Sequence, residues 1–165
     1  MKTIQREYLR SVIFGIEDSL VSTTGLIAGI GIGADNRRVV LLGGIVAIIV
    51  EATSMGAGEY LSDSAVAELD KMKRPPENPA ISGLLMCFSY LFAGMIPLAP
   101  VLFIEYPVSL WFSVAFALAG LFMLGFLKGR LLKTSPLKGG LKILIVGGIA
   151  TIFGIVVGSL FQLEN

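Results

Sequence analysis

The 165-residue sequence predicts an all-α integral membrane protein with five transmembrane helices, and three observations support this. Hydrophobic residues make up 55% of the chain and charged residues 15%, with a mean hydropathy of +0.83. Soluble domains carry about 25% charged residues, so this chain is too apolar to cover its surface in water. The apolar segments have the length of roughly 20 residues that a helix needs to cross a bilayer. The Lys and Arg residues are unevenly divided between the loops, which predicts the orientation.

We predict one transmembrane domain, residues 1–165, built from five helices at 11–34, 39–73, 80–104, 106–127 and 141–163. The first helix is apolar except for two adjacent acids, and the polar turn 35–38 ends it. The second helix carries acids in its second half. Because 39–73 is longer than the roughly 20 residues that span the hydrocarbon core, we expect its last turns to extend into the cytosol.

The remaining three helices each contain a stretch of about 20 residues without a charge, which is long enough to cross a bilayer. A proline-rich segment at 75–79 separates the third helix from the second. Glu105 and Pro107 separate the third helix from the fourth. The polar segment 128–142 separates the fourth helix from the fifth.

The positive charges predict which side of the membrane each loop occupies. The N-terminus and the loops after the second and fourth helices lie on one side and carry 11 of the 13 Lys and Arg residues. The other side has only Arg37 and Arg38. Cytosolic loops carry an excess of Lys and Arg, so we place the N-terminus in the cytosol and the C-terminus outside.

Several classes of function are excluded by composition. The chain has one cysteine, Cys87, and no histidine, so a site of several thiolates and a His-rich metal site are both excluded. A net charge of +1 gives no reason to expect nucleic acid as a partner. The polar segment 1–10 continues into a long helix, so we expect no cleavable signal peptide.

The acids in the first two helices are the strongest functional signal. An ionisable side chain at the bilayer centre costs roughly 2.5–3.5 kcal/mol, and three of the five helices avoid that cost. A rise of 1.5 Å per residue places Asp18 and Met55 at similar depths, roughly 10 Å from the cytosolic end of their helices. Glu51 lies one turn deeper than Met55, and Glu59 lies one turn shallower.

Helical spacing arranges these residues in two stripes. Glu51, Met55 and Glu59 share one face of the second helix. On the first helix, Asp18 shares a face with small residues that let helices approach closely in lipid: Ser22, Gly25, Gly29 and Gly33. Carboxylates bind hard and borderline divalent ions, and a thioether favours softer transition metals. We therefore predict a path for a divalent cation, with these candidate ligands: Asp18, Met55, Glu51, Glu59 and Asp63.

Other interpretations of single residues remain open. Glu17 and Asp18 are consistent with interfacial residues that pair with Arg10. Glu51 is consistent with a protonated acid that only joins helices. Glu59 and Asp63 are consistent with a solvated helix end.

Two stretches carry a resemblance to a known family: residues 15–34 read GIEDSLVSTTGLIAGIGIGA, and residues 51–62 read EATSMGAGEYLS. They resemble the vacuolar iron transporter family, whose first helix has Asp-Gly-Leu-Val before a glycine-rich half. The family's second helix ends with Ser-Met-x-x-Gly-Glu-Tyr. Asn-Pro at 78–79 and Ile-Pro-Leu at 96–98 are similar to the ends of its third helix, so the likeness covers nearly the whole chain.

The resemblance implies a five-helix, dimeric exporter that removes ferrous iron, and also manganese, from the cytosol in exchange for protons. The first-helix Asp and second-helix Met of the family's metal path correspond to Asp18 and Met55. The resemblance also places the first helix of each protomer at the dimer axis. The expected partners are the lipid bilayer, a second copy of the chain, divalent metal ions and protons. The metal is the transported ion, and no cofactor is expected.

The sequence departs from the family at three places. Ser19 stands where the family usually has Gly. Ala47 stands where some members carry a carboxylate two turns before the Met, and the carboxylate here is Glu51. The segment 63–78 is too short to hold the cytosolic metal-collecting domain of eukaryotic members, so we predict a minimal transporter in a prokaryotic plasma membrane.

Three alternatives to this function remain open. The first is a transporter of another divalent cation, because oxygen and thioether ligands alone do not select the metal. The second is a membrane scaffold that transports nothing. The third, an intramembrane enzyme, is disfavoured because the adjacent acids Glu17 and Asp18 face about 100° apart on a helix.

Overall fold

The structure is a computed structural model that describes residues 3–69 and 78–162, and these residues form five helices. The helices are α1 (Thr3–Ala34), α2 (Arg37–Leu69), α3 (Pro79–Phe103), α4 (Val108–Leu131) and α5 (Pro136–Leu160). Each is long and apolar enough to cross a membrane, and the described residues contain no strand. The predicted all-α architecture with five spanning helices is therefore confirmed.

The helix bounds differ from the predicted ones mainly at the end of the bundle where α1 begins, called here the basic end. There α1 begins at Thr3 rather than residue 11, α4 continues to Leu131, and α5 begins at Pro136. Hydropathy marks only the part of a helix that crosses the hydrocarbon core. Polar turns that extend the helix beyond the core were therefore not predicted. Residues 70–73 of the predicted second helix lie outside the described residues.

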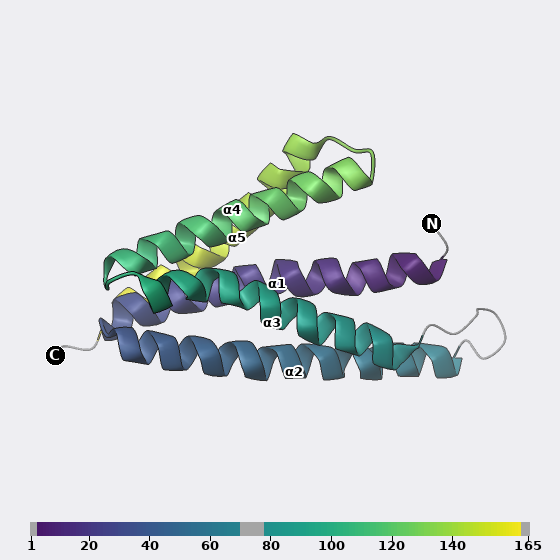
Figure 1. Cartoon of the computed structure of the whole chain (residues 1–165), viewed down its shortest axis with the longest axis horizontal. Helices are drawn as coiled ribbons and strands as arrows, with labels where there is room; N and C mark the ends of the chain where they lie inside the picture. The colour runs from purple at the N-terminus through teal and green to yellow at the C-terminus, as the bar shows by residue number, and fades with distance from the viewer. Residues whose placement is uncertain (1–2, 70–77, 163–165) are drawn as a thin grey trace.

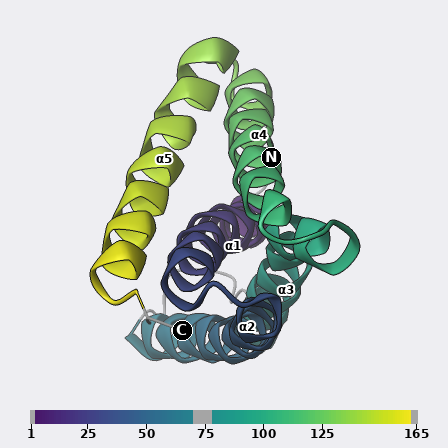
Figure 2. The same ribbon diagram turned by 90° about the vertical axis from the view of Figure 1, so that its left-hand side faces the viewer.

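Helix α1 lies at the centre of the bundle and contacts all four other helices. Figures 1 and 2 show α2 and α3 together on one side of α1, and α4 and α5 together on another. Among the described residues α2 and α5 make no contact with each other, although both contact α1.

Close approach of backbones holds the helix pairs together. A Cβ atom on Gly29 of α1 would lie 2.7 Å from the carbonyl oxygen of Gly154 on α5, which is too close for any side chain. A Cβ atom on Gly56 of α2 would similarly lie 2.8 Å from the carbonyl oxygen of Gly83 on α3. Lipid supplies no hydrophobic force between helices, so this close packing is a main source of their association.

The turn between α1 and α2 has the polar composition that the sequence predicted. Asp35 has a φ of 42°, and its N–H donates to the Gly31 carbonyl at 3.2 Å. The Asn36 side chain accepts from the Arg38 N–H at 2.9 Å and caps α2. Arg37 donates to the carbonyls of two residues at the end of α3, Val101 at 2.9 Å and Leu102 at 2.7 Å.

Candidate functional site

Glu51 of α2 accepts hydrogen bonds from two other helices. The Ser22 hydroxyl of α1 donates to its Oε2 atom at 3.1 Å, and the Tyr90 hydroxyl of α3 donates to the same oxygen. The Ser22 and Tyr90 hydroxyl oxygens lie 2.5 Å apart, and Tyr90 is 1% exposed. These three residues, called here the Glu51 cluster, join α1, α2 and α3 in the apolar part of the bundle.

Ser19 positions α3 beside the cluster. Its hydroxyl is fully buried and donates to the backbone carbonyl of Tyr90 at 2.6 Å. Opposite it on α3, a Cβ atom on Gly94 would lie 2.9 Å from the Ser19 hydroxyl oxygen. Ser19 therefore ties α1 to α3 at the residue whose side chain donates to Glu51.

Asp18 adds a second carboxylate near the cluster. It is half-buried on α1, one turn before Ser22, and close enough to Glu51 and Glu17 for their negative charges to interact. Met55 is also half-buried, one turn after Glu51 on α2. Asp18 and Glu51 thus lie on neighbouring helices within range of each other's charge, with Met55 one turn from Glu51.

Glu59 has a different environment from Glu51. Its Oε1 atom accepts from the Ser11 hydroxyl at 2.6 Å and from Arg10 at 3.3 Å, and its side chain is only 12% exposed. Asp63 is half-buried one turn further along α2. A metal ion that bound Glu59 would therefore compete with the positive charge of Arg10.

Glu17 lies on another side of α1 and pairs with Lys128 of α4 at 3.6 Å. The pairing with Arg10 that the sequence left open is not found in the described part of the chain. Arg10 instead pairs with Glu7 at 3.5 Å and with Glu59. Adjacent acids of α1 thus have separate roles, because Glu17 ties α1 to α4 whereas Asp18 lies near Glu51.

The candidate ligands of one chain do not form a ready metal site. Within residues 3–69 and 78–162, no three His, Cys, Asp or Glu side chains come close enough together to hold a metal ion. Around Glu51 the chain supplies two carboxylates, two hydroxyls and a nearby thioether. This donor set suits a hard or borderline divalent cation, but it is small for one held by protein atoms alone.

A groove of about 610 Å³ lies along the side of α1 that faces α5, called here the α1–α5 groove. Ser22 is among its lining residues, which are otherwise apolar or glycine, so the groove meets the Glu51 cluster at this residue. The glycines of the Asp18 stripe also line it, but their backbones pack against α5 of the same chain: Gly25, Gly29 and Gly33. These glycines therefore no longer support a dimer, as their close contacts are made within one chain.

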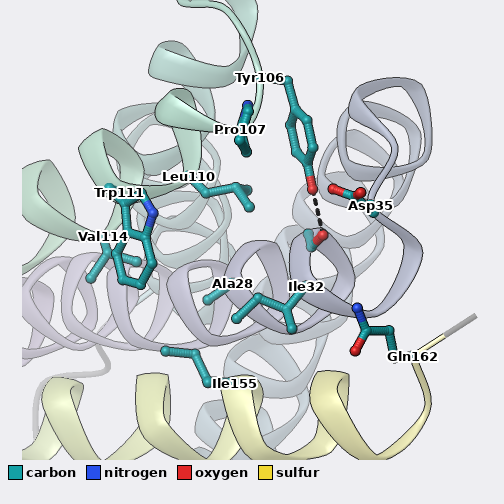
Figure 3. Close-up of a pocket in the computed structure, with 11 residues that line it drawn as sticks. Ala28, Ile32, Asp35, Tyr106, Pro107, Leu110, Trp111, Val114, Ile155 and Gln162 are labelled. Atoms are coloured by element: carbon teal, nitrogen blue, oxygen red, sulfur yellow. Dashed lines mark hydrogen bonds between the residues drawn. The ribbon is translucent and has the colours of Figure 1, made fainter.

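A separate pocket of about 270 Å³ lies at the opposite end of the bundle from the basic end, between α1, α4 and α5. Figure 3 shows Asp35 beside Tyr106, whose hydroxyl donates to the Gly31 carbonyl at 2.5 Å. Burial, and secondly the Asp35 carboxylate, raise the pKa of Tyr106 to about 12, so its hydroxyl stays protonated at neutral pH. With one carboxylate, this pocket is not a candidate metal site.

Sequence reasoning missed Tyr90. The third helix has no charge in its apolar stretch, so it drew no attention as a source of polar groups. The one available signal was the hydroxyl itself, because a buried Tyr usually finds a hydrogen-bond partner. Nothing in the sequence indicated that this partner is Glu51.

The chain is similar to a known family and to plant proteins over most of its length. The VIT family model matches residues 9–78 and 65–159. "Vacuolar iron transporter homolog 3" of Arabidopsis thaliana is 32% identical over 158 residues, which cover 87% of this chain and 78% of the relative. Homolog 4 of the same plant is 30% identical over 156 residues, with 87% and 79% covered. "VIT-like transporter 1b" of Glycine max is 26% identical over 164 residues, with 87% and 72% covered.

Proposed function

The chain belongs to the VIT family, and from this membership and the Glu51 cluster we propose that it carries divalent transition-metal ions, ferrous iron or manganese, out of the cytosol. The family resemblance predicted from the motifs is thereby confirmed. The relatives are named as transporters, which agrees with the prediction that the chain is not an enzyme.

The observation that carries the proposal is a carboxylate held by hydroxyls of two other helices inside an apolar bundle. Ionisable groups at membrane depth usually mark ion or proton paths. Asp18 and Glu51 repel each other when both are ionised, and a divalent cation between them would remove that repulsion. Met55 adds a sulfur that favours a transition metal over magnesium or calcium.

Exchange for protons follows from the same groups. A carboxylate binds a metal ion only when it is deprotonated, so protons and metal compete for Asp18 and Glu51. Protons that arrive from outside would release the metal there, and their release to the cytosol would restore both carboxylates. In this route Glu59 and Asp63 meet the metal first, and Met55 lies between them and Glu51.

The orientation and the dimer are parts of this proposal. The basic end of the bundle faces the cytosol, because the positive-inside rule places Lys- and Arg-rich loops there. A second copy packed through α1 would lie between α2 and α5, which make no contact with each other in the described residues. It would bring its own Asp18 and Glu51, and so enlarge a donor set that is small in one chain.

The five apolar helices make the chain an integral membrane protein. The expected prokaryotic plasma membrane gains no support from the relatives, which are plant proteins with "vacuolar" in their names. The membrane in which the proposed transport takes place is therefore not assigned from them.

The test is uptake of ferrous iron, with manganese in parallel, into proteoliposomes with an imposed pH gradient. We expect uptake by the parent protein to collapse when the gradient is dissipated. Asp18→Ala and Met55→Ala should each reduce it by at least about tenfold, as is typical when the surroundings of a bound metal are altered. Glu105→Gln, which removes an exposed acid between α3 and α4, is the matched control and should transport like the parent.

Two outcomes would contradict different parts of the proposal. Parent-like uptake by Asp18→Ala and Met55→Ala would overturn the site but leave transport standing. An absence of uptake by folded, inserted parent protein would favour the scaffold alternative, in which Glu51 only joins helices. In that case Glu51→Leu would leave the protein's biological role intact.

A further inference from the structure

A cavity of about 1140 Å³ lies at the basic end, between the first turns of α1, Glu59 of α2 and the end of α4. Figure 1 shows α4 and α5 leaning away from α1 towards this end. Of the candidate metal ligands only Glu59 lines this space, whereas Asp18, Glu51, Met55 and Asp63 do not. The cavity therefore needs an explanation of its own.

The lining of the cavity combines apolar and basic side chains. The apolar residues come from α1 and the end of α4: Leu9, Ile13, Phe14, Leu131 and Leu132. The charged residues are four basic and two acidic ones: Arg6, Arg10, Lys128, Lys133, Glu17 and Glu59. The lining thus carries a net charge of +2.

The two acids are already paired within the cavity wall. Glu17 pairs with Lys128, and Glu59 pairs with Arg10. The remaining basic residues, Arg6 and Lys133, make no ion pair with residues 3–69 or 78–162, and both are exposed. The excess positive charge therefore belongs to these two side chains, one at the start of α1 and one just after α4.

The position of the cavity along the helices matches the boundary of a bilayer. The apolar part of α1 begins just after Arg10, and the apolar part of α4 ends just before Lys128. Ile13 and Phe14 therefore lie where acyl chains begin, whereas the other apolar lining residues lie with the basic side chains at headgroup depth. Basic pockets between transmembrane helices on the cytosolic side bind anionic lipid headgroups.

We propose that this cavity binds one anionic phospholipid, with its phosphate between Arg6 and Lys133 and the start of its acyl chains against Ile13 and Phe14. A soluble anion could bind the basic side chains but would make no apolar contact with Ile13 and Phe14. A second copy of the chain is disfavoured as occupant, because a twofold interface sets the same patch against itself and so brings like charges together. The bound lipid bridges α1 and α4 at the end where these helices diverge.

The proposal is tested by thermal unfolding in nanodiscs of phosphatidylcholine alone and of phosphatidylcholine mixed with phosphatidylglycerol. We expect the parent protein to unfold at a higher temperature in the mixed discs. The double variant Arg6→Gln/Lys133→Gln should lose most of this increase, because each removed charge lowers the affinity about fivefold. Its unfolding temperature in phosphatidylcholine alone should match that of the parent, which shows that the variant folds.

The matched control is Lys138→Gln/Lys142→Gln, which removes two exposed charges from α5 at the same end but outside the cavity. This control should keep the full rise in unfolding temperature in the mixed discs. Arg6→Lys/Lys133→Arg, which retains both charges, should keep it as well. The proposal is overturned if the Arg6/Lys133 Gln variant keeps the increase or if the control loses as much. It is also overturned if soluble glycerol phosphate produces the same increase, or if the increase follows the number of protomers per disc rather than the lipid.

Discussion

Two faces of α1 meet the rest of the protein in different ways. Towards α2 and α3, Ser19 and Ser22 form side-chain hydrogen bonds with Tyr90 and Glu51. Towards α5, glycines bring backbone against backbone, and a Cβ atom on Gly29 would lie 2.7 Å from the carbonyl oxygen of Gly154. The first face is rich in groups that bind protons and cations, whereas the second has almost none.

This difference separates function from folding along one helix. Hydrogen bonds between membrane helices contribute only about 0.6 kcal/mol each on average, so the polar face adds little to the stability of helix packing. Close backbone packing depends on small residues and fails when one is enlarged. We therefore expect changes on the glycine face to affect folding, and changes on the polar face to affect transport while the fold persists.

The largest expected effect on folding is at the α1–α5 crossing. Gly154→Ala would place a methyl group against the backbone of Gly25, so we expect it to destabilise the protein by about 1–3 kcal/mol. The measurement is the unfolding temperature and the monodisperse yield in detergent. Gly148→Ala on the same helix is the control, since a Cβ atom there meets nothing within 4 Å. Equal stability of the two variants would refute the proposed role of the crossing.

The largest expected effect on transport is at Glu51. Glu51→Gln keeps an oxygen that can accept from Ser22 and Tyr90 but removes the negative charge. We expect uptake to fall by at least about tenfold while the unfolding temperature stays close to that of the parent. Parent-like uptake by this variant would mean that Glu51 is a structural acid, and the contrast between the two faces would then disappear.

A smaller effect is expected at Tyr90. Tyr90→Phe removes the hydroxyl that donates to Glu51 and keeps the ring that fills the space between helices. Hydrogen bonds between membrane helices contribute about 0.6 kcal/mol on average, so we expect uptake to fall roughly threefold. Tyr60→Phe, at an exposed position of α2, should have no effect on uptake. If both variants transport alike, Tyr90 does not position Glu51.

The smallest effect is expected at Glu17, the neighbour of Asp18. Its pair with Lys128 is partly exposed, and such pairs contribute about 0–1 kcal/mol. Glu17→Gln should therefore change stability and uptake little, whereas Asp18→Asn should abolish most uptake. Because Glu17 and Asp18 are adjacent but face different sides of α1, measuring both variants in one flux assay compares the two sides directly. Equal losses of uptake would show that the two sides of α1 do not differ in function.

The sequence predicted those features that depend on composition along one helix. Length and hydropathy indicate the five helices, and the turn 35–38 is visible because it is four polar residues in a row between two apolar segments. The cost of an acid in lipid singled out Asp18 and Glu51, whose charges are close enough to interact, and their role as metal ligands stays a prediction.

Features that depend on which helices meet were not predictable. The stripe of Gly25, Gly29 and Gly33 shows that some helix approaches closely, but not that α5 of the same chain does so. The pairing of Glu59 with Arg10 needs α1 to begin well before its apolar part. Tyr90 became a candidate only when α3 was placed against Glu51.

The central claim is that metal passes the polar face between α1 and α2, and the most direct test measures access to that face. Met55→Cys in a Cys87→Ser background places a single thiol one turn from Glu51. Its reaction with a small, charged thiol reagent should be slowed by manganese at concentrations that saturate uptake. Ser62→Cys, at an exposed position nearer the end of α2, should react equally fast with and without manganese. A thiol at position 55 that reacts at the same rate in both conditions would contradict the account.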